Sequence, residues 1–132
     1  MTIALEIPKF DKPVKVLLAV AAQHSDVVVT LVQTATDCLD DLNVAWDRID
    51  VPSASEIAPS IGIAERMANF DGYVALGAIL DDGLLHSETE FRDAHHALTL
   101  LGLQGLCVGN GLLAVNPNEN YVRKLSPKLE FR

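Results

Sequence analysis

One histidine stands where a buried strand gives way to a helix, in the stretch ALGAILDDGLLHSETEF that covers residues 75–91. A histidine side chain can accept and donate a proton near neutral pH, so His86 is a candidate for general acid–base catalysis. The same position also suits a solvated polar residue ahead of a helix, which Ser87 and Glu90 would open as a capping box. Both interpretations of His86 stay open on the residues alone.

Other polar residues accompany the remaining predicted strands. His24 follows the first strand, Glu56 follows the second, and Asp81 and Asp82 follow the third. Asn110 stands between two glycines in the fourth. Free backbone amides at the helix starts nearby would favour anions and polar ligand atoms. Each residue also has a structural alternative, because His24 can cap a helix, Glu56 gains from the helix dipole, and Asp-Asp-Gly is an ordinary turn.

Aliphatic runs alternate with helical patterns along the chain. The runs, predicted as strands, cover residues 14–22, 45–52, 71–80 and 105–115, with a short additional strand near 2–7. Helical spacing of apolar residues covers 27–42, 56–68 and 87–103, and a last short helix opens near 116. Continuous aliphatic strands between helices are typical of a parallel sheet covered on both faces. We therefore expect one α/β domain over residues 1–132, with three layers, four parallel strands and an added N-terminal strand.

Ligands of such sheets bind beyond the carboxyl ends of the strands. The sequence places these ends at residues 21–25, 51–56, 79–86 and 109–113. We therefore expect the polar residues of these four segments to converge at one edge of the sheet.

Composition narrows the classes of function. The chain of 132 residues carries a formal net charge of −8, from 10 basic and 18 acidic residues, which argues against nucleic-acid binding. Apolar residues make up 49% of so small a chain, and this predicts burial against other subunits. The sequence offers no membrane span, secretory signal or metal-ligand pattern. We expect a cytoplasmic protein in which Cys38 and Cys107 are reduced and buried.

Four motifs in register resemble the lumazine synthase family of the riboflavin pathway. VPSASEI (51–57) resembles the family's V-P-G-x-x-E-I/L, and FDGYVALGAIL (70–80) resembles its Y-D-x-V/I-x-L-G-x-V-I strand. VGNGLLAVNPNEN (108–120) resembles its G-x-G-x-L-T strand and the following N-D-x-x-Q-A helix start. His86 falls where the family keeps its histidine. The resemblance covers about residues 14–124 and implies a flavodoxin-like fold.

The resemblance implies condensation of 5-amino-6-ribitylaminouracil with 3,4-dihydroxy-2-butanone 4-phosphate to 6,7-dimethyl-8-ribityllumazine, without a metal or organic cofactor. It implies that His86 shuttles protons. The substrate-binding residues that it implies are Gln23, His24, Ala54, Ser55, Glu56, Ile57, Ile79, Leu80, Asn110, Leu112, Leu113, Arg123 and Lys124. Asn110, Leu112 and Leu113 would come from a neighbouring subunit of a homo-pentamer or a multiple of pentamers. The N-terminal strand would add to that neighbour's sheet.

Several positions depart from the family pattern: Gln23 and Ser87 stand where the family has aromatic residues, VPS replaces VPG, and the largest departure is in one loop. The family has a phosphate-binding R-G-E/D-T/S loop before its histidine, whereas residues 81–85 are DDGLL. Carboxylates repel a phosphate dianion, so Arg123 or Lys124 would have to supply a cation. This departure leaves an alternative open, a non-catalytic paralogue that binds a flavin- or pterin-type ligand or forms an oligomeric shell. An unrelated flavodoxin-like binding domain is a third possibility.

Overall fold

A parallel sheet forms the centre of the protein, as a computed structural model shows for residues 12–23 and 25–116. Its strands are β1 (Lys15–Ala21), β2 (Ala45–Val51), β3 (Gly72–Leu80) and β4 (Val108–Val115), in the spatial order β2-β1-β3-β4. The helices are α1 (Ser25–Asp41), α2 (Ile57–Met67) and α3 (Leu85–Leu103), with a short 3₁₀ helix, η1 (Ala54–Glu56), ahead of α2. The predicted alternation of strands and helices is therefore confirmed over the described residues.

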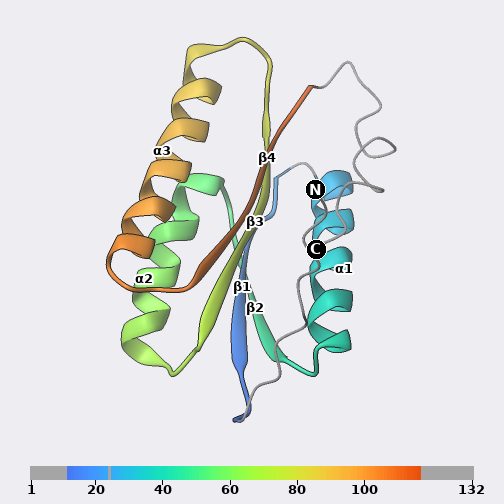
Figure 1. Ribbon diagram of the computed structural model, residues 1–132. Coiled ribbons are helices and arrows are strands. Elements are labelled where there is room, and N and C mark those ends of the chain that lie inside the picture. The colour runs from blue at the N-terminus through green and yellow to red at the C-terminus, as the bar shows by residue number, and fades with distance from the viewer. Residues whose placement is uncertain (1–11, 24, 117–132) are drawn as a thin grey trace, which may run out of the picture.

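The helices cover both faces of the sheet and make three layers. Helix α1 lies on one face, and α2 and α3 lie together on the other (Figure 1). All three pairings, β1 with β2, β1 with β3 and β3 with β4, are parallel. This order and direction confirm the predicted flavodoxin-like sheet of four parallel strands. The additional strand predicted near residues 2–7 and the helix predicted from residue 116 lie outside the described residues.

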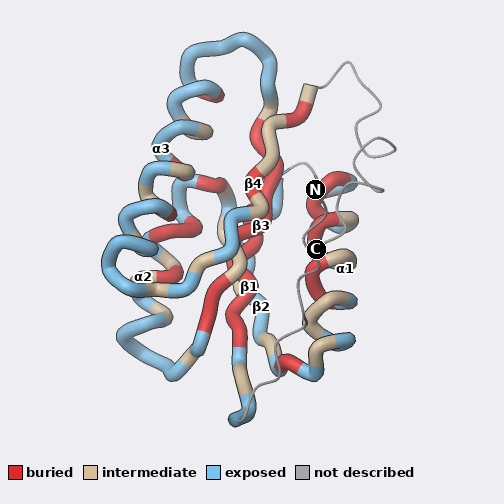
Figure 2. Tube along the Cα trace, in the orientation of Figure 1, coloured by how far each residue is buried: buried red, intermediate tan, exposed pale blue. Residues whose placement is uncertain are grey.

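The core sits on both sides of the two central strands. Along β1, Leu18 and Val20 pack toward α1, while Leu17 and Ala19 pack toward α2 and α3, because successive side chains of a strand point to opposite faces. Figure 2 shows the buried residues concentrated in the strands and on the helix faces turned toward them. Both faces of β1 and β3 are thus covered, which explains their continuous aliphatic sequences.

The predicted start of α2 agrees with the structure, whereas α3 begins earlier than predicted. Pro59 lies in the first turn of α2, as expected. Helix α3 begins at Leu85, with Leu84 as its N-cap, so the predicted capping box of Ser87 and Glu90 is wrong. Ser87 instead lies inside the helix and is buried. A turn ahead of the helix fixes its start two residues earlier than the sequence pattern suggested.

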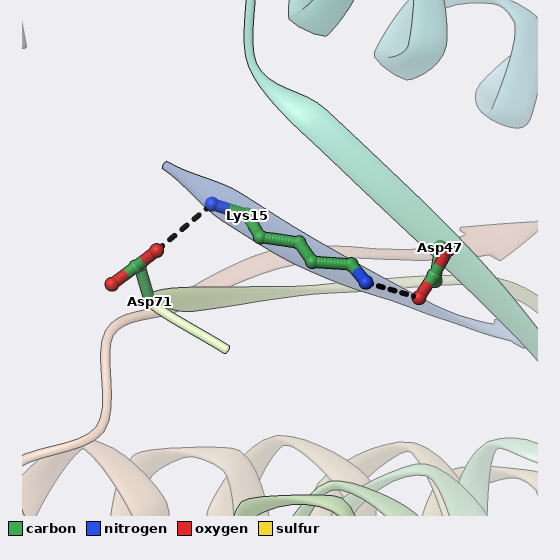
Figure 3. Close-up of polar contacts among 3 residues, drawn as sticks. All are labelled: Lys15, Asp47 and Asp71. Atoms are coloured by element: carbon green, nitrogen blue, oxygen red, sulfur yellow. Dashed lines mark hydrogen bonds and ion pairs between the residues drawn. The ribbon is translucent and has the colours of Figure 1, made fainter. Parts of the chain in front are cut away.

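Near the amino ends of the strands, one lysine links β1 to its surroundings. The backbone N–H of Lys15 donates to Asp71 Oδ2 at 2.8 Å, and its Nζ lies 3.0 Å from Asp47 Oδ2 on β2 (Figure 3). Both side chains of the ion pair are about half exposed, so the pair contributes little to stability. These contacts lie at the end of the sheet opposite the loops that were predicted to bind ligands.

The cysteines differ from the prediction. Both are free thiols, but Cys38 is only half-buried and Cys107 is exposed. The expectation that both are buried is therefore wrong, because Cys107 lies in the turn before β4 and outside the core. Among the described residues, no helix is long and apolar enough to cross a membrane.

Candidate functional site

The switch in strand order lies between β1 and β3, at the centre of the sheet. From β1 the chain moves outward to β2, and then returns to the other side of β1 with β3. In open parallel sheets this point leaves a crevice at the carboxyl ends of the two central strands. Gln23 follows β1 there, and the loop that carries His86 into α3 follows β3.

Two hollows at this edge share the side chain of His86. The first has a volume of about 490 Å³ and is lined by Gln23, Ile79, Leu80, Asp82, His86, Ser87 and Glu90. The second, of about 660 Å³, is more open and is lined by Ser55, Leu84, Leu85, His86, Thr89, Glu90 and Asp93. We call them the inner and the outer hollow. They bring together five residues predicted from the sequence, Gln23, Ser55, Ile79, Leu80 and His86.

His86 is the second residue of α3, and its side chain is exposed between the two hollows. Its Nε2 lies 3.5 Å from Ser87 Oγ, at the outer limit of a hydrogen bond. The imidazole is thus held loosely by the protein and faces space that a ligand can fill. This geometry suits proton transfer to or from a bound molecule.

The loop before His86 is built around the Asp82 carboxylate. Asp82 Oδ1 accepts a hydrogen bond from the Leu84 N–H at 2.9 Å, and Gly83 between them has a φ of 77° that favours glycine. The pKa of Asp82 is lowered, mainly because its charged form accepts the bond from Leu84, and the hydrogen bond of Ser87 and the charge of His86 act in the same direction. Asp82 therefore remains a carboxylate at neutral pH.

The inner hollow is consequently acidic. Asp82 and Glu90 both line it, and none of its described lining residues is a lysine or arginine. His86 is the one lining residue able to carry a positive charge. A neutral, polar ligand suits this hollow better than a phosphate dianion.

The Glu56 side chain binds the backbone of a nearby residue, Ser53. Its Oε2 accepts a hydrogen bond from the Ser53 N–H at 3.1 Å, while the Glu56 N–H donates to the Ser53 carbonyl, also at 3.1 Å. The Glu56 side chain on the Ser53 N–H, together with the Ser53 side chain on the Glu56 N–H, is the capping box that the protein does form, and it opens η1 rather than α3. The side chains of Ala54 and Ile57 are buried, so these two residues can offer a ligand only their backbone groups. Glu56 itself is exposed.

The predicted residues of β4 lie away from both hollows. Asn110 pairs in register with Ala75, whereas the carboxyl end of β3, Leu80, pairs with Val115. Five residues of strand separate these positions, which is about 17 Å. Asn110 therefore lies near the start of β4, because β4 begins at Val108 and not at residue 105.

The predicted position of this segment is wrong. Residues 109–113 are not at the carboxyl end of their strand, and the strands next to Glu56 and Asn110, β2 and β4, are the two edges of the sheet. Leu112 is buried against α2 and α3, and Leu113 packs partly on the α1 side. His24, Arg123 and Lys124 lie outside the described residues.

Among the lining residues that were not predicted as site residues are three that follow His86 on α3, namely Thr89, Glu90 and Asp93. They stand three, four and seven positions after His86, so they share its helix face. That spacing is visible in the sequence, but it becomes informative only when α3 is known to begin before His86.

Comparison with known proteins places these features in a family. Residues 13–127 match the family of 6,7-dimethyl-8-ribityllumazine synthase. A protein of Jannaschia sp. named 6,7-dimethyl-8-ribityllumazine synthase is 41% identical over 115 residues, which cover 87% of this chain and 65% of the relative. A 6,7-dimethyl-8-ribityllumazine synthase 1 of Mesorhizobium japonicum is 33% identical, over 74% of this chain and 63% of the relative. A 6,7-dimethyl-8-ribityllumazine synthase 1 of Rhizobium meliloti is 32% identical, over 82% of this chain and 74% of the relative. The chain thus spans slightly less than two thirds of the first two relatives.

Proposed function

The chain belongs to the 6,7-dimethyl-8-ribityllumazine synthase family, and from this membership we propose that it catalyses the family's reaction. The substrates are 5-amino-6-ribitylaminouracil and 3,4-dihydroxy-2-butanone 4-phosphate, and the product is 6,7-dimethyl-8-ribityllumazine. The amine of the pyrimidine forms a Schiff base with the ketone and water leaves, phosphate is then eliminated, and the ring closes with loss of a second water. These reaction steps require proton transfers and no external oxidant, so we propose that the reaction needs no metal or organic cofactor.

The observation that carries this proposal is the position of His86. It lies at the switch point of the sheet and is shared by both hollows, so it can reach molecules bound in either one. In the proposed reaction His86 shuttles protons in both condensations: it takes a proton from the attacking amine and gives one to the hydroxyl that leaves as water. Its loose contact with Ser87 leaves the imidazole free to turn between the two reactants.

The remaining site residues divide between two parts of the pyrimidine substrate, its ring and its ribityl chain. We assign the pyrimidine to the inner hollow, where Ile79 and Leu80 offer apolar contact and Gln23 offers a polar group. The 3₁₀ helix η1, ahead of α2, lies beside the outer hollow, and its exposed residues Ser55 and Glu56 with the nearby backbone amides would bind the ribityl hydroxyls there. His24, Arg123 and Lys124 keep the substrate-binding roles proposed from the family resemblance.

The site is proposed to be completed by a second copy of the chain. Asn110, Leu112 and Leu113 cannot line the hollows of their own chain, so we assign them to the site of a neighbouring subunit. Exposed large apolar side chains support burial against other copies, among them Met67, Leu85 and Leu103, each about 80% exposed. We therefore propose a homo-pentamer or a multiple of pentamers. Exposed, free Cys107 suits a reducing compartment, and we propose the cytoplasm.

A second function is favoured by the acidic inner hollow. Asp82 and Glu90 would oppose binding of the phosphate-bearing substrate, while a neutral ribitylated pyrimidine or flavin is free of that repulsion. The alternative is thus a protein that binds such a ring system without turning it over.

One experiment separates the two functions. The purified protein is mixed with both substrates, and formation of lumazine is followed by its absorbance, with a His86→Ala variant as the control. Binding of the pyrimidine alone is measured by calorimetry on the same samples. Catalysis predicts lumazine formation that depends on His86. Pyrimidine binding with no lumazine at any substrate concentration would reject the enzyme and support the alternative.

A further inference from the structure

His95 is a second histidine on α3, and it faces the edge strand instead of the hollows. Its ring packs against Phe91, with 4.3 Å between the ring centroids, and its residue is half-buried. The Nε2 atom is inaccessible to solvent and has no hydrogen-bond partner among the described residues. Buried polar atoms are nearly always paired. The cost of leaving Nε2 unpaired therefore has to be offset by another contact of the same side chain.

That compensating contact is made by the other ring nitrogen. Asn110 Nδ2 lies 2.7 Å from His95 Nδ1, and Asn110 Oδ1 accepts a hydrogen bond from the Leu112 N–H at 3.0 Å. An amide nitrogen can only donate, so Nδ1 must be the acceptor and the ring proton must sit on Nε2. The reverse orientation of Asn110 would set its NH₂ group against the Leu112 N–H, which is also a donor. The two contacts therefore fix each other.

The pair leaves Asn110 with defined groups for a ligand. Asn110 is exposed on β4, and its two contacts use one amide hydrogen and one direction of the carbonyl oxygen. The second amide hydrogen and the second lone pair stay available, and the two contacts hold the amide in one orientation. A donor next to an acceptor complements the edge of a uracil ring or neighbouring hydroxyls of a ribityl chain.

We propose that His95 is a positioning residue, which orients the Asn110 amide toward the ribitylated pyrimidine bound in the neighbouring subunit's site. This inference rests on the proposed function, because only in a shared site does Asn110 meet the substrate. A side chain needed only for packing against Phe91 could be apolar and would leave no N–H unpaired. The acceptor at Nδ1 is what an apolar side chain could not supply.

Substitutions that keep or remove the acceptor test the proposal. In His95→Gln the amide oxygen can accept from Asn110, whereas in His95→Leu nothing can. We expect His95→Leu to raise the KM for the pyrimidine about tenfold, with kcat and the KM for the butanone phosphate little changed. His95→Gln should restore most of the loss. His96→Leu, at the exposed neighbouring position of the same helix, is the matched control and should behave like wild type.

The same substitution in an Asn110→Ala background separates positioning from packing. His95→Leu should then have no further effect on the KM, because it acts only through Asn110. An equal effect in both backgrounds would overturn the proposal and assign His95 a structural role.

The wild-type protein offers a readout that needs no activity. Nitrogen chemical shifts of the histidine rings, measured by NMR at a pH where the rings are neutral, should show His95 with its proton on Nε2. A proton on Nδ1 overturns the inference whether or not the protein makes lumazine. Lack of turnover with the predicted tautomer and with pyrimidine binding sensitive to His95→Leu rejects only the enzymatic function. Lack of pyrimidine binding by the wild type rejects both proposals.

Discussion

His86 and Asp82 line the same hollow and have opposite consequences for a phosphate-bearing substrate. His86 is the group expected to move protons, whereas the Asp82 carboxylate stands in the loop that the family resemblance aligns with a phosphate-binding segment. Asp82 also shapes that loop, because it accepts the hydrogen bond of the Leu84 N–H. The same carboxylate therefore orders the start of α3 and lowers the affinity expected for a dianion.

The first prediction concerns His86. His86→Ala should lower kcat for lumazine formation by about 100-fold or more, because a positioned proton shuttle contributes at least that much. The KM values should change less, since the apolar contacts of Ile79 and Leu80 remain. Steady-state absorbance assays measure both, with His96→Ala as the control. A variant within twofold of wild type would leave His86 as a solvated residue of the helix start.

The second prediction removes the charge of Asp82 and keeps its shape. In Asp82→Asn the side-chain oxygen can still accept from Leu84, but the carboxylate is lost. The KM for the butanone phosphate should fall about fivefold, which corresponds to one exposed charge contact, and the KM for the pyrimidine should stay the same. Because the pKa of Asp82 is lowered, the difference should persist from about pH 5 to pH 8.

Asp47→Asn is the matched control for net charge, since Asp47 lies toward the amino ends of the strands. If it lowers the KM as much as Asp82→Asn does, the effect comes from the total charge of the protein. If neither changes the KM, the Asp82 carboxylate does not face the phosphate.

Among the strands and helices, the strands were the most predictable from the sequence. Their aliphatic runs are long and fully buried in β1 and β3, and few alternatives fit such a pattern. The start of α3 was less predictable, because two segments have the capping-box spacing. Ser53 with Glu56 forms that box, and Ser87 with Glu90 does not. The Asp82–Leu84 hydrogen bond decides between them, and no spacing rule in the sequence shows it.

Part of the site could be predicted from the order of strands and helices. Residues that follow β1 and β3 converge as expected, because the ends of neighbouring parallel strands meet at one edge. Asn110 was misplaced because residues 109–113 were assigned to the carboxyl end of a strand that runs on to Val115, whereas Asn110 is the third residue of β4. Its partner His95 could not be found from the sequence, since a contact between a helix and an edge strand depends on their packing.

The third prediction concerns the close approach of β4 to β3. A Cβ atom at Gly111 would lie 2.7 Å from Leu76 Cδ2 and 3.0 Å from the Ala75 carbonyl oxygen, and the backbone oxygen cannot move aside easily. Gly111→Ala should therefore lower the free energy of unfolding by about 1–3 kcal/mol. Chemical denaturation measures the change.

Gly62→Ala provides the contrast. Gly62 lies within α2, and a Cβ there meets nothing within 4 Å. This substitution should raise the free energy of unfolding by about 0.5–1 kcal/mol, because alanine favours a helix. Equal changes in the two variants would contradict the close contact between β3 and β4.

The surface of the protein favours association with other copies of the chain over a monomer. The large apolar side chains left exposed are spread over all three helices, and β2 and β4 each have an unpaired edge among the described residues. The acidic net charge of −8 makes unspecific clustering less favourable. Association should therefore be limited to complementary faces of the same chain.

The fourth prediction is the size of the assembly. Sedimentation velocity at micromolar concentration should give a species of about 72 kDa, five chains of 14.3 kDa each, or a multiple of it. Moderate salt should not dissociate it, because the proposed contacts are mainly apolar. A monomer under these conditions would remove the shared site and, with it, the proposed role of Asn110.

The separation of His86 from Asn110 means that two defective variants should repair each other when mixed. In a ring, each site would combine His86 of one subunit with Asn110 of the next. If His86→Ala and Asn110→Ala proteins are dissociated, combined in equal amounts and reassembled, about a quarter of the sites receive both native side chains. Assayed with the pyrimidine well below its KM, where Asn110→Ala is defective, the hybrid should regain about a quarter of wild-type activity, above either parent, whereas parents mixed without dissociation should show no gain. Activity equal to the mean of the parents would mean that each chain carries its site alone.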